Sequence, residues 1–198
     1  MTDIILASAS QIRAELLAAA GVAVTIVPAR VDEPAIRASL QAEGARPRDL
    51  ADALAEAKAR RVAAKAGDAL VIGCDQVLEF EGSVFGKPET PDAARAQLRS
   101  LRGRTHTLHS AVVLYQSQEP IWRHLGEVRL TMRAFSDAYL EDYLARNWES
   151  VRQSVGAYKI EEEGARLFSR VDGDHFSVLG LPLFPLLGYL GDRGYVST

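Results

Sequence analysis

One carboxylate lies inside an apolar segment of the chain, which makes it the first candidate for catalysis. Asp75 belongs to residues 71–78, where every other residue except Gln76 is apolar or small. An ionised carboxylate among apolar neighbours is costly unless it pairs with a cation or holds a metal. The pattern therefore favours Asp75 as a catalytic group or metal ligand, and a structural ion pair at a strand end is the alternative.

A second segment, residues 6–17, combines hydroxyl groups with an arginine where a short strand would become a helix. The first N–H groups of a helix lack partners, and the positive end of the helix dipole attracts anions. Ser8 and Ser10 can add hydroxyl donors, and Arg13 can form paired hydrogen bonds with phosphate oxygens. The segment indicates a phosphate site, unless Ser10 only caps the helix.

Two lysines could face the same anion. Lys58 falls on the apolar side of a predicted helix, where an inward ammonium needs an anionic partner. Other basic residues of that helix fall in a similar sector, so a lysine that only reaches outward to solvent is the alternative. Lys87 precedes Pro88, which fixes the chain after a predicted hairpin and could hold the ammonium toward Asp75.

Two further carboxylates have a chemical interpretation. Glu33 lies in an acidic turn and could ligate a hard divalent cation together with Asp75. Glu161 could accept two hydrogen bonds from the Watson–Crick N–H donors of guanine, whereas it would repel the carbonyl-flanked edge of uracil or thymine. For both residues, a solvated acidic stretch is the simpler alternative.

The composition limits the classes of function. The 198 residues are 47% hydrophobic and 25% charged, which is typical of a soluble protein, and we expect one domain over residues 1–198. No apolar run approaches the ~20 residues of a membrane helix, and a net charge of -3 offers no basic surface for a nucleic-acid duplex. The start lacks signal-peptide features, and one cysteine allows no internal disulfide, so a cytoplasmic protein is expected.

Interleaved strands and helices must position these side chains. Strands are predicted at residues 4–6, 22–27, 70–80, 83–85, 105–115, 122–134, 155–160 and 166–171. Helices are predicted to follow Ser10, Pro47, Thr90, Ser136 and Pro182, with an irregular, partly helical stretch at residues 30–46. Because several strands form hairpins, an α/β fold on a mixed sheet fits better than a purely parallel one.

Taken together, these segments resemble the Maf family of nucleoside triphosphate pyrophosphatases, in order along nearly the whole chain. The segments that carry the resemblance are Leu6-Ala7-Ser8-x-Ser10-x-x-Arg13, the Glu33 turn, Ala57-Lys58-Ala59, Gly73-x-Asp75-Gln76-Val77, Gly86-Lys87-Pro88, Gly156-Ala157-Tyr158 and Val178-x-Gly180-Leu181-Pro182-Leu183. The resemblance implies a bent mixed sheet flanked by helices, with two lobes around a central cleft as in inosine triphosphate pyrophosphatase-like proteins. It also implies hydrolysis of a nucleoside triphosphate to the monophosphate and pyrophosphate.

The resemblance further implies a divalent cation, magnesium or manganese, held by Glu33 and Asp75. Asp75 would accept the proton of the attacking water, although a bound metal could instead lower the pKa of that water and leave Asp75 mainly a ligand. Contacts to the substrate are implied for Ser8, Arg13, Lys58 and Lys87.

Three positions bear on the choice of nucleotide. The branch of the family that acts on dTTP and UTP typically has arginine, threonine and glutamine where this chain has Ile12, Gln76 and Glu161. Gln76 and Glu161 are more similar to the branch that takes 7-methyl-GTP, whose cationic base favours a carboxylate. Ile12 offers neither the arginine's charge nor the cation–π stacking of an aromatic residue.

Asp75 and Gln76 would point to opposite faces of a regular strand. If both serve one site, a bulge or strand end is expected there. The alternatives to 7-methyl-GTP hydrolysis are the same chemistry on dTTP or UTP, and a nucleotide-binding regulator of septum formation and cell division, with which the family is also associated. The resemblance makes a homodimer plausible without naming an interface.

Overall fold

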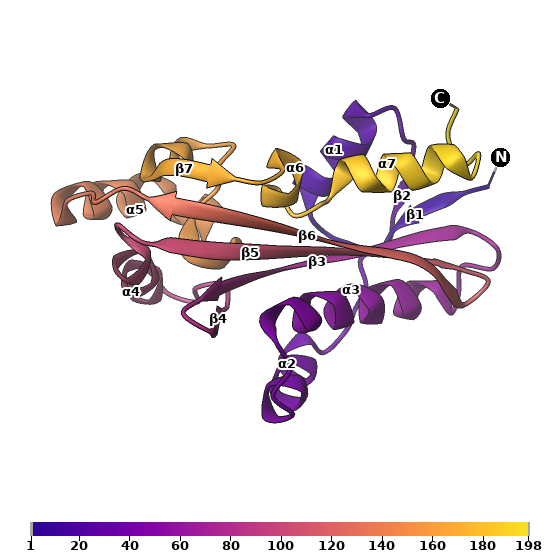
Figure 1. Ribbon diagram of the computed structural model, residues 1–198, viewed down its shortest axis with the longest axis horizontal. Coiled ribbons are helices and arrows are strands. Elements are labelled where there is room, and N and C mark those ends of the chain that lie inside the picture. The colour runs from indigo at the N-terminus through magenta and orange to yellow at the C-terminus, as the bar shows by residue number, and fades with distance from the viewer. Residues whose placement is uncertain (1, 198) are drawn as a thin grey trace.

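The computed structural model describes residues 2–197 and shows one mixed β-sheet with helices on both faces (Figure 1). The strand order is β2-β1-β3-β5-β6-β7, and β4 pairs with β3 outside this path. Strand β1 is parallel to both of its neighbours, β2 and β3, and all other neighbouring strands are antiparallel. The strands are β1 (Ile4–Leu6), β2 (Thr25–Ile26), β3 (Leu70–Phe80), β4 (Ser83–Phe85), β5 (Thr105–Gln116), β6 (Glu119–Met132) and β7 (Phe168–Asp172). The predicted α/β fold class with a mixed sheet is confirmed.

The helices begin near the predicted capping residues. They are α1 (Gln11–Ala19), α2 (Glu33–Ala42), α3 (Pro47–Ala63), α4 (Pro91–Leu101), α5 (Asp137–Val151), α6 (His175–Val178) and α7 (Leu183–Asp192). Thr90 and Ser136 accept backbone N–H groups at the starts of α4 and α5, as N-caps do. Among residues 2–197, no helix has the length and hydropathy needed to cross a membrane.

Apolar side chains fill both faces of the sheet at one end. Leu17 of α1 and Leu186 of α7 belong to a buried cluster with Ile72, whereas Leu54 of α3 belongs to another with Val71. Since successive residues of a strand face opposite ways, the two clusters lie on opposite faces. Figure 1 shows α3 on one side of the sheet and α1 and α7 on the other.

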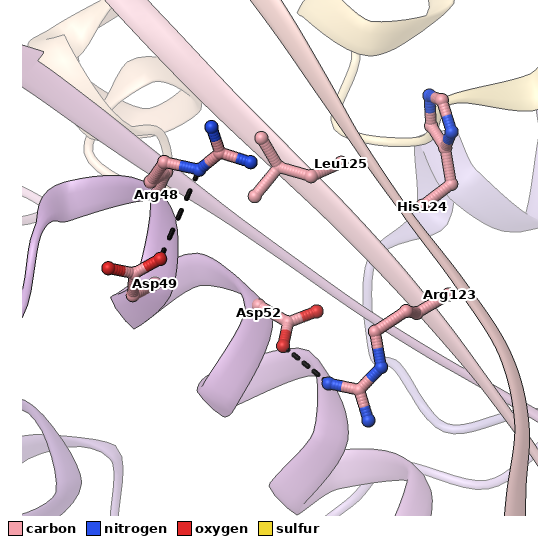
Figure 2. Close-up of a pocket in the computed structure, with 6 residues that line it drawn as sticks. All are labelled: Arg48, Asp49, Asp52, Arg123, His124 and Leu125. Atoms are coloured by element: carbon pink, nitrogen blue, oxygen red, sulfur yellow. Dashed lines mark hydrogen bonds and ion pairs between the residues drawn. The ribbon is translucent and has the colours of Figure 1, made fainter.

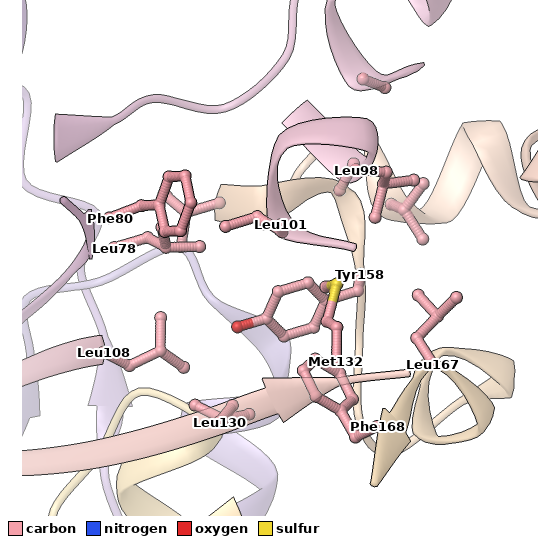
Figure 3. Close-up of a cluster of buried hydrophobic side chains, with 14 of the residues drawn as sticks. Leu78, Phe80, Leu98, Leu101, Leu108, Leu130, Met132, Tyr158, Leu167 and Phe168 are labelled. Carbon is pink, nitrogen blue, oxygen red and sulfur yellow. The ribbon is translucent and has the colours of Figure 1, made fainter. Parts of the chain in front are cut away.

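A third cluster fills the other end of the sheet. Leu78, Leu108 and Leu130 pack there with Leu98 of α4 and with Tyr158 (Figure 3). The sheet is thus covered by separate cores at its two ends, as the predicted two-lobed architecture requires.

Three predicted segments differ from the structure. Strand β2 covers Thr25–Ile26 rather than residues 22–27, since it pairs only with the short β1. Residues 33–42 form the regular helix α2, capped by Asp32, within the stretch at residues 30–46 that was expected to be irregular and only partly helical. The strand expected at residues 155–160 is wrong, because Gly156 and Ala157 adopt φ values of 78° and 57° that an extended strand excludes.

Candidate active site

A cavity of about 690 Å³ lies between the two ends of the sheet, lined by Ala7 of one core and Leu108 of another. Its volume lies in the usual range for small-molecule sites. Every residue predicted to contact substrate or metal lines it, namely Ser8, Ile12, Arg13, Glu33, Lys58, Asp75, Gln76, Lys87 and Glu161. The fold therefore brings the whole predicted set together, while the roles of these residues stay predictions.

The cavity opens at a gap along the edge of β3. Strand β1 pairs with residues 70–72 of β3, and β4 pairs with residues 78–80. In the described chain, no strand pairs with residues 73–77 on that side. Arg13 Nη1 instead donates a hydrogen bond to the Cys74 carbonyl at 3.0 Å, so a side chain occupies part of the gap.

The pairing of β3 corrects one prediction about this strand. Strand β3 pairs with β5 without a register shift from Val71 to Glu79, so the expected bulge at Asp75 and Gln76 is wrong. The two side chains lie on opposite faces of a regular strand. Both line the same cavity because the unpaired edge opens it to both faces.

Asp75 is buried and paired with a lysine. Lys58 Nζ lies 2.6 Å from Asp75 Oδ1 and 2.8 Å from Glu33 Oε1, and the Asp75 side chain is 7% exposed. The close approach of α3 to β3 depends on Gly73, because a Cβ there would lie 2.7 Å from the Ala59 Cβ. The inward-facing Lys58 predicted from the helical wheel therefore has the anionic partners it needs.

The charges of the cavity act on the acidity of Glu33. Burial opposes ionisation of this carboxyl, but the hydrogen bond and charge of Lys58 outweigh it, helped by the charges of Arg37 and Lys87. The net result holds the pKa of Glu33 below its ordinary value. Glu33 is therefore an ionised, hydrogen-bond-accepting group at neutral pH.

Arg37 is a site residue that sequence reasoning missed. Its Nη2 lies 3.6 Å from Asp75 Oδ2, and it lines the cavity from α2, one turn beyond Glu33. The spacing of four residues from Glu33 would have placed both on one helix face, but residues 30–46 were expected to be irregular. Asp75 Oδ2 and Arg37 Nη1 are both buried without a hydrogen-bond partner among the described residues.

The N-terminus of α1 forms a cluster of donors at another wall. Ser8 Oγ accepts hydrogen bonds from the Ser10 N–H at 3.2 Å and from Arg13 Nη1 at 3.4 Å. The Ser10 side chain makes no capping hydrogen bond, so its hydroxyl is not used by the helix. Arg13 Nε is buried without a partner in the described chain. Lys87 is exposed and lines the cavity from the segment after β4.

The far end of the cavity has apolar walls and one carboxylate. Leu108, Tyr158 and Val178 line it, and Glu161 is exposed there. Within residues 2–197, no hydrogen bond or ion pair engages the Glu161 carboxylate. Gln76 is used differently, since its Nε2 donates to Ser110 Oγ and to the carbonyls of residues 177 and 178 at 2.9–3.0 Å.

The donor set fits a divalent cation that takes part of its shell from a ligand. Among the described residues, no group of three or more histidine, cysteine, aspartate or glutamate side chains could hold a metal by itself. The Glu33 and Asp75 carboxylates nevertheless lie close enough together to contact the same Lys58 ammonium. Asp75 Oδ2 also lacks a hydrogen-bond partner among the described residues. Magnesium is commonly held by one or two carboxylates with water and substrate phosphates completing the shell.

A second hollow is lined by residues of α3 and β6 and has no comparable chemistry. Figure 2 shows it between α3 and β6, with Arg123 directed toward Asp52. Arg123 forms ion pairs with Asp52 at 2.6 Å and Glu56 at 2.9 Å, so its charge is already neutralised.

The fold is a mixed sheet with a cavity at a gap in its edge, lined by cations and by the carboxylates of Glu33, Asp75 and Glu161. The chain belongs to the Maf family. Residues 3–193 match that family, described as Maf-like protein. The chain is 56% identical over 196 residues to a Ruegeria sp. (strain TM1040) protein named nucleoside triphosphate pyrophosphatase, covering 99% of this chain and 98% of the relative.

Other relatives carry a more specific name. The chain is 47% identical over 195 residues to a Rhizobium meliloti (strain 1021) protein named 7-methyl-GTP pyrophosphatase, with 98% of each chain covered. A Mesorhizobium japonicum protein of the same name is 46% identical and is covered completely, as is this chain. The predicted family is confirmed, and these full-length relatives are hydrolases by name.

Proposed function

We propose that this protein is a nucleoside triphosphate pyrophosphatase, which hydrolyses the bond between the α- and β-phosphates and releases a nucleoside monophosphate and pyrophosphate. The observation that carries the proposal is the buried Asp75 carboxylate in a cavity whose cations can meet a triphosphate. The names of full-length relatives at 56% and 47% identity support the same activity.

In this proposal, Asp75 receives the proton of a water that attacks the α-phosphorus. The negative charge that grows on the phosphate oxygens is stabilised by Arg13, Lys58 and Lys87, and pyrophosphate is the leaving group. A carboxylate within hydrogen-bond reach of the water is sufficient as general base. The Ser8 hydroxyl and the N–H groups at the start of α1 orient the phosphates.

Glu33 and Asp75 would hold a divalent cation, magnesium or manganese, since carboxylate ligands suit both. When bound, the cation supplies charge neutralisation to the phosphates. Lys58 already contacts both carboxylates, so it holds them close together before ligands arrive.

The finer proposal is that the nucleotide has a modified purine base such as 7-methyl-GTP. Glu161 has an uncommitted carboxylate beside apolar walls, which suits both the N–H edge of guanine and the positive charge of a methylated base. Gln76 contributes indirectly, because its donors hold the residues of α6 that form one wall of the cavity. Ile12 adds an aliphatic contact from α1.

The experiment that tests substrate class is pyrophosphate release with magnesium or manganese from a panel of 7-methyl-GTP, GTP, UTP, dTTP, 5-methyl-UTP and inosine triphosphate. Preference for 7-methyl-GTP supports the finer proposal. Preference for the pyrimidine nucleotides would keep the enzyme class and overturn the role of Glu161. No release from any nucleotide would leave a nucleotide-binding regulator of cell division as the better account.

A house-cleaning role, which removes non-standard nucleotides before polymerases use them, fits this substrate class. It also fits a cytoplasmic enzyme, a proposal that fractionation of cells would test. The homodimer stays a prediction that sedimentation would test.

A further inference from the structure

Arg37 is a cation of the cavity that the proposed mechanism does not use. It extends from the second turn of α2, and its side chain is 22% exposed. Arg13, Lys58 and Lys87 line the same cavity, together with the carboxylates of Glu33 and Asp75. With Arg37, the cations at this end outnumber the carboxylates by two.

One nitrogen of the Arg37 guanidinium is held in the cavity without a hydrogen-bond partner. Its Nη1 is buried and has no partner among residues 2–197. Its nearest anion is Asp75 Oδ2, and the 3.6 Å from Nη2 to that oxygen is too long for a hydrogen bond. A buried donor without a partner is costly, so an arginine kept this way has donors available for a ligand.

The chemistry of that ligand follows from the surroundings. Two carboxylates already meet Lys58 at 2.6 and 2.8 Å, so the charge left over at this end is positive. Arg13 Nε, in the same cavity, is another buried donor without a partner in the described chain. Planar guanidinium groups match phosphate oxygens with paired hydrogen bonds, which a lysine cannot form.

We infer that Arg37 is a further substrate-binding residue, which donates hydrogen bonds directly to the polyphosphate of the nucleotide. The inference rests on the proposed function for the identity of the nucleotide, but the contact itself is with phosphate. An alternative role is positioning, in which Arg37 acts only by holding the Asp75 side chain in place. The two roles differ in whether Asp75 is needed for the effect.

The test is binding of inorganic pyrophosphate to the full chain at constant ionic strength, measured by isothermal titration calorimetry. Arg37→Gln should weaken binding by roughly tenfold or more, as expected when a charged hydrogen-bond donor is lost. The affinity of Arg37→Lys for pyrophosphate should lie between that of Arg37→Gln and that of the wild type. Arg46→Gln is the matched control and should leave affinity unchanged, because Arg46 contacts only Asp49 at the surface.

A double-mutant cycle separates direct contact from positioning. In the Asp75→Asn background, Arg37→Gln should weaken pyrophosphate binding by a similar factor. An effect that disappears in that background would overturn the inference and assign Arg37 to positioning. Equal affinity of the wild type and Arg37→Gln, or no pyrophosphate binding by the wild type, would overturn it as well. Circular dichroism melting of each variant checks the fold.

Failure of this inference is distinguishable from failure of the proposed function. Arg37-dependent pyrophosphate binding without hydrolysis of any nucleotide would support the inference and contradict the function. Hydrolysis with the same KM and kcat in the wild type and Arg37→Gln would support the function and contradict the inference.

Discussion

The ammonium of Lys58 lies 2.6 Å from Asp75 Oδ1, which ties helix α3 to the buried carboxylate of strand β3. The same ammonium lies 2.8 Å from Glu33 Oε1 at the start of α2. One lysine thus joins three elements that follow one another in the chain, α2, α3 and β3. This relationship makes Lys58 a stabilising residue, and in the proposed function Lys58 is also a cation that contacts the phosphates.

Lys58→Met should destabilise the protein, because it leaves the buried Asp75 carboxylate without its closest cation. Removing one partner of a buried ion pair costs about 3 kcal/mol, and we expect a loss of this order in the free energy of unfolding in urea. Addition of Asp75→Asn to Lys58→Met should recover part of the loss, since the unpaired charge is then absent. Unchanged stability of Lys58→Met would contradict the importance of this pair.

Gly180→Ala should reduce activity through Arg13. A Cβ at this position would lie 2.9 Å from Arg13 Nη2, and Gly180 has a φ of 90°. Displacement of the guanidinium should raise KM for the nucleotide by roughly tenfold, as expected for the loss of a charged hydrogen bond. The measurement is steady-state pyrophosphate release.

Gly194→Ala is the control for Gly180→Ala. Gly194 also has a left-handed backbone, with a φ of 72°, but a Cβ added there would meet no neighbouring side chain or backbone within 4 Å. Backbone strain alone should lower stability in both variants. If the two variants raise KM equally, Arg13 is not the cause.

Glu161→Gln should change the choice of nucleotide. The variant keeps the size of the side chain but loses the charge that would favour a methylated guanine. We expect kcat/KM for 7-methyl-GTP to fall by roughly tenfold to hundredfold relative to that for UTP. Glu162→Gln is a useful comparison, since Glu162 already pairs with Lys159 at 3.1 Å. A ratio that does not change in Glu161→Gln would exclude this residue from base recognition.

His106 should make stability depend on pH. Burial lowers its pKa from 6.5 to about 4, and its Nε2 lies 2.7 Å from the Tyr158 hydroxyl. Between these values the unfolded chain binds a proton that the folded protein does not, so stability rises with pH there. The contribution of neutral His106 to the free energy of unfolding is fully present above about pH 6.5 and falls as the pH drops toward 4.

The loss of unfolding free energy caused by His106 should reach about 3 kcal/mol near the acid limit of this pH window. Urea unfolding of the wild type and His106→Phe, at several pH values across this window, measures it. The dependence on pH should be weaker in the variant, and equal slopes would show that other groups cause it.

Much of the fold was predictable because periodicity and capping act locally. The bounds of β3 and the starts of α4 and α5 follow from apolar runs and from Thr90 and Ser136. The strand expected at residues 155–160 failed because Gly156 and Ala157 have left-handed backbone, which the apolar character of this segment does not report.

The members of the site were predictable from their chemistry, but their mutual geometry was not. The gap at the edge of β3, which lets Asp75 and Gln76 line one cavity, depends on where β1 and β4 end. Arg37 was missed because its signal is a spacing on a helix that was not predicted. The use of Gln76 donors by the residues of α6 is a contact over about 100 residues, which single-residue reasoning does not reach.

The most direct test of the central claim is pyrophosphate release by the wild type and Asp75→Asn, with magnesium or manganese and the preferred nucleotide of the panel. The account predicts release of pyrophosphate and nucleoside monophosphate in equal amounts by the wild type. It predicts a loss of roughly a thousandfold or more in kcat for the variant, while nucleotide binding is retained. A variant that keeps the wild-type rate would contradict the assignment of Asp75 as the catalytic carboxylate.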